Sequence, residues 1–236
     1  GTIRRMASPG NQQTDGFLLI DKPLGWTSHD VVAKARHLTG IRRIGHGGTL
    51  DPLATGLLVL GLGSATKQLD RFVQGDKTYV ATVRLGATST TDDGEGEITE
   101  SALQEPPAET AVRRALEEMR GPCDQLSPVY SALKTAGKKH YQLARAGKPV
   151  EREARPIVIH ELALLEYDWP SVRFRCRVSK GTYVRAMARD LGASLGTGGY
   201  LEALRREAVG DSRVADAVPI DPFPEDWATR LLPTGR

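Results

Sequence analysis

The decapeptide G-G-T-L-D-P-L-A-T-G (Gly47–Gly56) places one carboxylate, Asp51, between a flexible Gly-Gly approach and a proline. A fully apolar run, Leu57–Leu60, follows it and predicts a buried strand. A carboxylate at the mouth of a buried strand is badly placed for stability, because burying an ionised group is costly unless the group is paired. The position therefore indicates a functional site, although an aspartate before a proline is also a common turn residue.

The composition is that of an ordinary globular protein, with 236 residues, 39% hydrophobic residues, 26% charged residues and a net charge of +3. This length accommodates one large domain or two small ones. Cys123 and Cys176 lack CxxC spacing and indicate reduced thiols in a cytoplasmic protein. Neither a histidine cluster nor a membrane-length apolar run is present, so we expect no metal and no membrane span. Residues 1–15 lack the apolar segment of a signal peptide and are expected to be a disordered lead.

Apolar periodicity separates the expected strands from the expected helices. Strands are predicted at Gly16–Asp21, Thr55–Gly63, Thr78–Leu85, Pro156–Tyr167 and Val172–Val178. Caps and glycine stops predict six helices. One is capped by Thr27 or Ser28 and ends at Gly40, one starts at Ser64, and one is capped by Thr182. The other three cover Thr110–Arg120, Lys139–Ala146 and Leu201–Glu207. Without a regular βαβ rhythm, this mixture indicates an α+β fold with a mixed or antiparallel sheet.

Two segments are expected to lack regular structure. Residues 88–109 hold seven acids and no Lys or Arg, which predicts a solvated loop. A metal-binding loop is the sharper alternative, but the calcium-loop spacing is missing. The tail from Pro219 is rich in proline and is expected to be irregular.

Basic residues gather in the second half of the chain. Between Pro170 and Arg189 there are six Lys or Arg residues and no acid. Arg173, Arg175 and Arg177 alternate along one predicted strand and therefore share a face. Such cations repel one another unless an anion is near, and RNA phosphate is the common one. A solvated strand face is the alternative. The interleaved aromatics are candidates for stacking on bases: Tyr130, His140, Tyr141 and Tyr183.

These residues together resemble the bacterial tRNA pseudouridine-55 synthases of the TruB type. The resemblance runs from about Gly16 to Gly210 through six motifs in the family's order. They are D-K-P-L-G-W-T-S (Asp21–Ser28), G-H-G-G-T-L-D-P-L-A-T-G (Gly45–Gly56), D-K-T-Y (Asp76–Tyr79) with R-L-G-A-T-S-T-T-D-D (Arg84–Asp93), S-P-V-Y-S-A-L-K (Ser127–Lys134) with H-Y-Q-L-A-R-A-G (His140–Gly147), K-G-T-Y-V-R-A-M-A-R-D-L-G (Lys180–Gly192) and L-R-R-E-A-V-G (Leu204–Gly210).

This chain departs from the family pattern in three places. Gly47 stands where the family usually has threonine, and Ser127-Pro128 stands where it usually has Pro-Pro. Bacterial members generally carry a further small RNA-binding domain after the catalytic region. That domain is expected to be absent or truncated here.

The resemblance implies a pseudouridine synthase domain over residues 16–218, with a mixed, largely antiparallel sheet flanked by helices around a central RNA-binding cleft. It implies that uridine 55 in the T loop of tRNA is flipped out and isomerised without metal or cofactor. Asp51 would be the catalytic carboxylate. Arg185 would be the cation that keeps it ionised. Tyr79 would stack against the flipped uracil.

Further roles around the RNA follow from the same resemblance. His46 would sit beside the flipped nucleotide, and Lys22 would buttress Tyr79. Arg205 and Arg206 would contact the RNA backbone or brace the domain, with a salt-bridged helix face as the alternative. Tyr183 and the three strand arginines are further candidate RNA contacts. The partner would be the T arm of tRNA, bound by a monomer in the cytoplasm without a protein partner or a membrane.

Two other interpretations stay open. A ribosomal-RNA or guide-RNA-dependent synthase would use the same chemistry, but ribosomal types usually have R-L-D where this chain has Thr49-Leu50-Asp51. Guide-dependent types carry a C-terminal RNA-binding domain that we expect to be missing from this chain. A non-catalytic tRNA-binding or tRNA-folding protein is a different class, and the joint presence of Asp51, Tyr79 and Arg185 argues against it.

Overall fold

The structure is a computed structural model that describes residues 14–102, 105–128, 134–135, 138–139 and 152–235. It divides into two compact units. The first unit is Gly1–Lys77 with Arg205–Arg236, and the second is Thr78–Leu204. The domain expected over residues 16–218 includes parts of both units, because the chain leaves the first unit after Lys77 and returns to it at Arg205, and it stays a prediction.

The first unit is built on a buried antiparallel strand pair. Strand β1 (Gly16–Lys22) pairs with β3 (Ala54–Leu62) from Gly16↔Leu62 to Lys22↔Gly56. Strand β2 (Ile44–His46) pairs antiparallel with β3, and β14 (Val218–Pro219) pairs parallel with β1. All residues of β3 except Thr55 are buried, as the apolar run predicts.

Helix α1 (Ser28–Thr39) begins and ends where the sequence predicts. Thr27 is its N-cap and forms a capping box with Asp30, while Gly40 ends the helix in the left-handed conformation. The helix expected from Ser64 is instead a 3-10 turn, η1 (Gly63–Gln68), followed by α2 (Asp70–Gln74).

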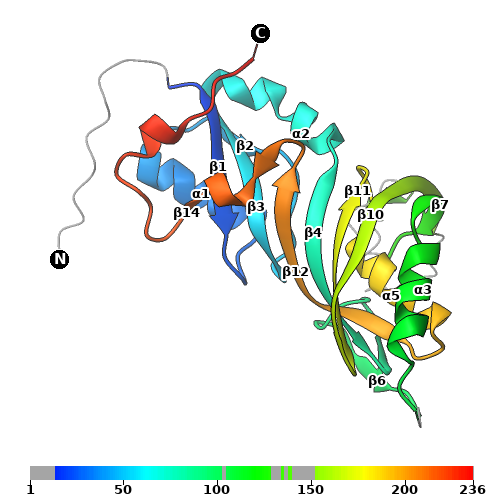
Figure 1. The fold of residues 1–236 in the computed structure, drawn as a ribbon. Coiled ribbons are helices and arrows are strands. Elements are labelled where there is room, and N and C mark those ends of the chain that lie inside the picture. Colours follow the sequence, from blue (N-terminus) through cyan, green and yellow to red (C-terminus); the bar gives the residue numbers. More distant parts are fainter. Residues whose placement is uncertain (1–13, 103–104, 129–133, 136–137, 140–151, 236) are drawn as a thin grey trace, which may run out of the picture. The chain divides into compact units, whose positions relative to one another are not determined.

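The second unit holds a sheet ordered β4-β11-β10-β7. These strands are β4 (Lys77–Leu85, whose first residue belongs to the first unit), β11 (Ser171–Val178), β10 (Ala154–Asp168) and β7 (Gly121–Leu126). Strand β10 pairs antiparallel with both β11 and β7. Burial alternates along β4 and β11, as their apolar alternation predicts. Helix α3 (Glu109–Glu118) packs against β10 and against α5 (Val184–Ser194) (Figure 1). This architecture confirms an α+β fold with a mostly antiparallel sheet.

Three further predictions of local structure are wrong. Leu201–Glu207 lies in a strand, β12 (Gly199–Val209), because tertiary pairing overrides the helix preference of L-E-A-L-R-R-E. The acidic segment contains a hairpin, β5 (Ala87–Ser89) with β6 (Ile98–Glu100). Thr182 does not cap α5. Its hydroxyl donates to the Ser179 carbonyl (2.8 Å), and the N-cap is Tyr183.

The ends of the chain differ from expectation where they are described. Asp15 Oδ1 accepts a hydrogen bond from the Ser64 N–H (2.7 Å), whereas residues 1–13 lie outside the described part. The tail contains a 3-10 turn, η3 (Trp227–Arg230), and the main chains of Phe17 and Leu232 exchange two hydrogen bonds. The tail is therefore packed rather than simply irregular. The helix expected at Lys139–Ala146 lies largely outside the described residues, and Lys138–Lys139 is a short strand, β9, paired with β8 (Lys134–Thr135).

Candidate active site

Asp51 lies on the loop between β2 and β3 and is exposed to solvent. Its main-chain carbonyl accepts a hydrogen bond from the Ala54 N–H (2.9 Å), which closes a turn through Pro52. The expectation of a buried carboxylate is therefore wrong, because the loop carries this side chain outward while the preceding Leu50 is only 3% exposed. Asp51 is therefore not a site candidate because it is buried. It is one because the main chain of the surrounding loop is held in place by hydrogen bonds.

Ser28, the first residue of α1, fixes the peptide immediately before Asp51. The Ser28 hydroxyl donates to the Leu50 carbonyl (3.1 Å) and accepts from the Leu50 N–H (2.8 Å). The Gly25 N–H donates to the Pro52 carbonyl (2.8 Å) on the other side of Asp51. The D-K-P-L-G-W-T-S segment thus holds the loop on both sides of the carboxylate.

Arg206 braces the same loop from β12. Its side chain is 2% exposed and donates to the carbonyls of Leu57 (2.8 Å), Gly48 (3.1 Å) and Thr49 (3.5 Å). A Cβ on Gly56, whose φ is +106°, would overlap the Arg206 main chain, so glycine is required where β12 approaches β3. The burial of this side chain favours bracing over RNA contact, and RNA contact by Arg206 stays a prediction.

Arg205, the next residue along β12, makes a different contact. Its guanidinium holds the Asp21 carboxylate in a bidentate pair (3.0 and 2.9 Å) and is partly exposed. Neighbouring residues of a strand point to opposite faces, so the two arginines cannot share one role.

Lys22 is a buried cation beside the loop. It is 0% exposed, and its ammonium donates to the carbonyls of Pro23 (3.0 Å) and Trp26 (2.6 Å). Burial lowers the pKa of Lys22, whereas the nearby carboxylates of Asp51 and Asp30 raise it. The first unit therefore contains a buried lysine whose pKa responds to the Asp51 carboxylate, a contact that the sequence did not predict.

His46 and Gly47 lead into the loop from β2. Burial lowers the pKa of His46, and the positive charges of Arg206 and His29 lower it further, so the imidazole is neutral at pH 7. Its Nδ1 is buried without a hydrogen-bond partner in the described part of the chain. A Cβ on Gly47 would lie 3.0 Å from Phe72 Cβ, so the threonine usual in the family would require Phe72 to shift.

Tyr79 and Arg185 belong to the second unit. Tyr79 lies on the buried face of β4 and is 9% exposed. Arg185 lies in the first turn of α5, with its side chain 11% exposed. Its Nη1 lies 3.8 Å from Asp93 Oδ2 and donates to the Thr91 carbonyl (3.3 Å). Asp93 Oδ1 in turn accepts from the Thr91 hydroxyl (2.6 Å) and the Glu95 N–H (3.0 Å).

The predicted solvated loop thus supplies the carboxylates that hold α5. Asp92 Oδ2 lies 3.2 Å from Arg189 Nη1, and burial raises the pKa of Asp92 against the opposing effect of Arg189. Asp92 has a φ of 62°, a left-handed conformation that favours glycine. Sequence reasoning missed both aspartates, although the T-T-D-D residues stand inside a motif quoted for the family.

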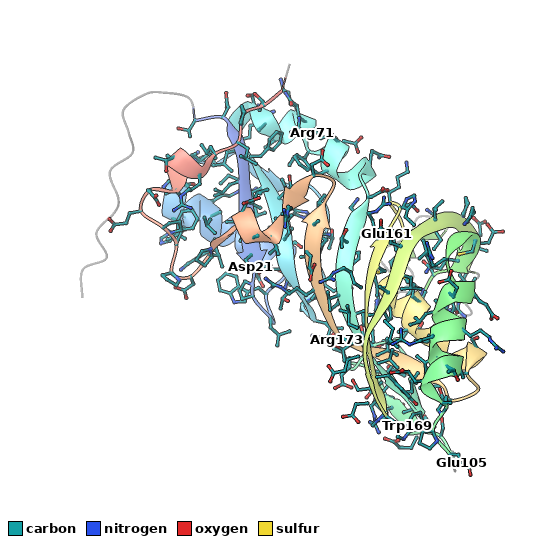
Figure 2. The ribbon with its side chains drawn as sticks, viewed as in Figure 1. Asp21, Arg71, Glu105, Glu161, Trp169 and Arg173 are labelled. Carbon is teal, nitrogen blue, oxygen red and sulfur yellow. The ribbon has the colours of Figure 1, made fainter. Side chains whose placement is uncertain are left out.

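The arginine face of β11 lies opposite carboxylates on β10. Arg177 Nη2 lies 3.5 Å from Glu161 Oε1, and Arg173 Nη2 lies 3.6 Å from Glu166 Oε2. Figure 2 labels Glu161 and Arg173 on these strands. Arg173 and Arg177 therefore have protein anions beside them, which favours the solvated-face alternative. RNA binding by this face stays a prediction.

Two wider surveys of the described residues complete the picture. None of the described helices is long and apolar enough to cross a membrane. No group of three or more His, Cys, Asp or Glu side chains in the described ranges is arranged to hold a metal ion.

The sequence model of the TruB family pseudouridylate synthases (N-terminal domain) matches residues 36–184, more than half of the chain. The chain belongs to the TruB family. It is 47% identical over 226 residues to a tRNA pseudouridine synthase B of Thermobifida fusca (strain YX), a match that covers 92% of this chain and 77% of the relative. It is 50% identical over 204 residues to a tRNA pseudouridine synthase B of Leifsonia xyli subsp. xyli (strain CTCB07), covering 83% and 67%.

Solved structures also resemble this TruB-family chain. A chain of a Cbf5-Nop10-Gar1 complex has a TM-score of 0.71 at 25% identity, covering 94% of this chain and 60% of its own length. A chain of an H/ACA RNP bound to a substrate RNA containing 2'-deoxyuridine has a TM-score of 0.70 at 24% identity, which supports the fold.

Proposed function

We propose that this TruB-family chain is a tRNA pseudouridine synthase that isomerises uridine 55 of the T loop. The observation that carries the proposal is the loop around Asp51. Ser28, Gly25 and Arg206 hold the loop's main chain on several sides while the carboxylate is exposed. The relatives named tRNA pseudouridine synthase B, at 47% and 50% identity, support tRNA as the substrate.

The chemistry needs few groups. The N1–C1′ bond of uridine breaks, the uracil turns, a C5–C1′ bond forms, C5 loses a proton and N1 gains one. Attack on the sugar, attack on the base and removal of a sugar proton each need an ionised carboxylate beside the nucleotide. We assign that carboxylate to Asp51.

The remaining roles come from the family resemblance. We propose that Tyr79 stacks on the flipped uracil and that Arg185 supports the charge of Asp51. The ion pair with Asp93 and the hydrogen bond to the Thr91 carbonyl hold the Arg185 guanidinium in one position, as this role requires. His46, as a neutral imidazole, and Tyr183 are proposed to lie beside the RNA. We further propose that a monomer acts without guide RNA, cofactor or protein partner.

The test is to treat unmodified tRNA with the purified protein alone and to map pseudouridine at every uridine. The proposal expects pseudouridine at position 55 and at no other site. Conversion elsewhere in the tRNA would leave a synthase but refute the assigned position. Binding of tRNA without any conversion would favour the non-catalytic tRNA-binding interpretation. Conversion only after addition of a guide RNA would favour a guide-dependent synthase.

A further inference from the structure

Gln125 makes a paired contact with the main chain of Tyr183. It lies near the end of β7 and is 5% exposed. Its Nε2 donates to the Tyr183 carbonyl (3.1 Å), and its Oε1 accepts from the Tyr183 N–H (2.8 Å). One carboxamide thus pairs with both main-chain polar groups of Tyr183, which fixes the position and the orientation of that residue.

This contact sets where helix α5 begins. Tyr183 is the N-cap of α5 and has no side-chain cap of its own. The first N–H groups of a helix lack partners within the helix and depend on outside acceptors. A second tie joins the same two elements, because Arg189 Nη2 donates to the Leu126 carbonyl (2.8 Å). The end of β7 therefore holds the first two turns of α5.

Arg185 lies two residues after Tyr183, so its main chain is placed by this contact. Its guanidinium is nearly buried and must reach both Asp93 Oδ2 and the Thr91 carbonyl. A shift of the helix start by a fraction of an ångström would move the guanidinium away from these acceptors. Misplacement of about 1 Å costs about a hundredfold in rate when a group must be oriented for chemistry.

We infer that Gln125 is a positioning residue that acts on the reaction through Arg185. The inference rests on the proposed function for the role of Arg185. Gln125 stands just before the quoted S-P-V-Y-S-A-L-K motif and carries no charge, so the sequence analysis did not single it out. A purely structural glutamine would support folding and leave the effect of Arg185 unchanged.

The first experiment is a double-mutant cycle measured by single-turnover conversion of saturating tRNA. Gln125→Met keeps the side-chain length and removes both hydrogen bonds, and it should lower the rate by about 10- to 100-fold. In the Arg185→Met background the same change should lower the rate by less than about twofold. An equal fold-loss of rate from Gln125→Met in the wild-type and Arg185→Met proteins would overturn the inference. Asp124→Asn, on the exposed side of β7, is the matched control and should leave the rate unchanged.

A second variant and a second readout keep the test decisive. Gln125→Asn is one methylene shorter and cannot make both bonds, so a well-folded Gln125→Asn protein with wild-type rate would also overturn the inference. The NMR signal of the Arg185 Nε–H group needs no turnover. It should move in Gln125→Met and stay in place in Asp124→Asn. If wild-type protein makes no pseudouridine, the proposed function fails, while an unmoved Arg185 signal refutes the positioning itself.

Discussion

Two adjacent arginines on β12 show that residue type alone does not determine the role of a side chain. Arg205 and Arg206 both carry a guanidinium, and the sequence offers RNA contact or bracing for each. The structure buries Arg206 against three main-chain carbonyls and leaves Arg205 partly exposed beside Asp21. The difference arises from the side-chain alternation of the strand, which the helix prediction for this segment obscured.

Arg206→Met is predicted to destabilise the protein far more than Arg205→Met. Removing the buried guanidinium leaves three carbonyls without their donor, which costs about 3 kcal/mol of unfolding free energy. A partly exposed ion pair such as Arg205–Asp21 is worth about 0–1 kcal/mol. Urea unfolding of the two variants against wild type measures the difference. Equal losses would show that Arg206 does not brace the Asp51 loop.

His46 is predicted to contribute to acid sensitivity. The pKa of His46 is lowered in the folded state by burial and by Arg206, whereas in the unfolded chain it is near the usual histidine value of 6.5. Between pH 6.5 and the lower pKa of the folded state, His46 is protonated in the unfolded chain but not in the folded protein. The unfolding free energy therefore decreases as the pH falls through this range. His46→Gln should therefore lose less stability than wild type between pH 7.5 and about pH 5. Parallel losses in urea titrations at the two pH values would contradict this assignment.

At the scale of elements, the start of α1 both caps the helix and holds the Asp51 loop. Thr27 caps the helix, and the next residue, Ser28, holds Leu50. Ser28→Ala should cost about 1–3 kcal/mol of unfolding free energy, and it should also slow conversion because the peptide before Asp51 is released. Thr27→Ala is the matched control, costing about 1 kcal/mol through the lost cap with the Leu50 contacts intact. Comparable losses of rate in the two variants would mean that helix stability, and not the Leu50 contact, governs activity.

The arginine face of β11 gives a prediction with a definite sign. If Arg173, Arg175 and Arg177 bind RNA phosphate, replacing all three with Gln should weaken tRNA binding and flatten its salt dependence. Replacing Glu161 and Glu166 with Gln should then tighten binding, because these carboxylates compete with phosphate for the same cations. Unchanged dissociation constants and salt slopes in both variants would place the RNA elsewhere.

Prediction from sequence succeeded where one local pattern determines an element. The apolar run of β3, the alternation of β4 and β11, and the Thr27 and Gly40 caps of α1 each carry their own signal. It failed at β12, where pairing with distant strands decides the conformation. It also failed at Asp92 and Asp93. An acidic run predicts a solvated loop, and only the fold shows that these carboxylates pair with arginines of α5.

At the scale of the whole molecule, the six motifs are distributed over two compact units. Asp51, Lys22 and His46 belong to the first unit, and Tyr79 and Arg185 to the second. Motif order along the chain indicated the family, which the comparisons confirm. It did not reveal the side chains that hold the Asp51 loop and α5, because Ser28, Asp93 and Gln125 act through main-chain and ion-pair contacts that only the folded chain forms.

The central claim is that Asp51 drives isomerisation of the T-arm uridine. The most direct measurement treats an isolated T-arm stem-loop, and a ribosomal-RNA hairpin of equal length, with wild-type protein and with Asp51→Asn, and maps pseudouridine in each. We expect wild type to convert the uridine at position 55 of the T arm and to leave the ribosomal hairpin unmodified. Asp51→Asn should bind the T arm with near-normal affinity and form no pseudouridine. Appreciable conversion by Asp51→Asn, or conversion of the ribosomal hairpin in place of the T arm, would contradict the account.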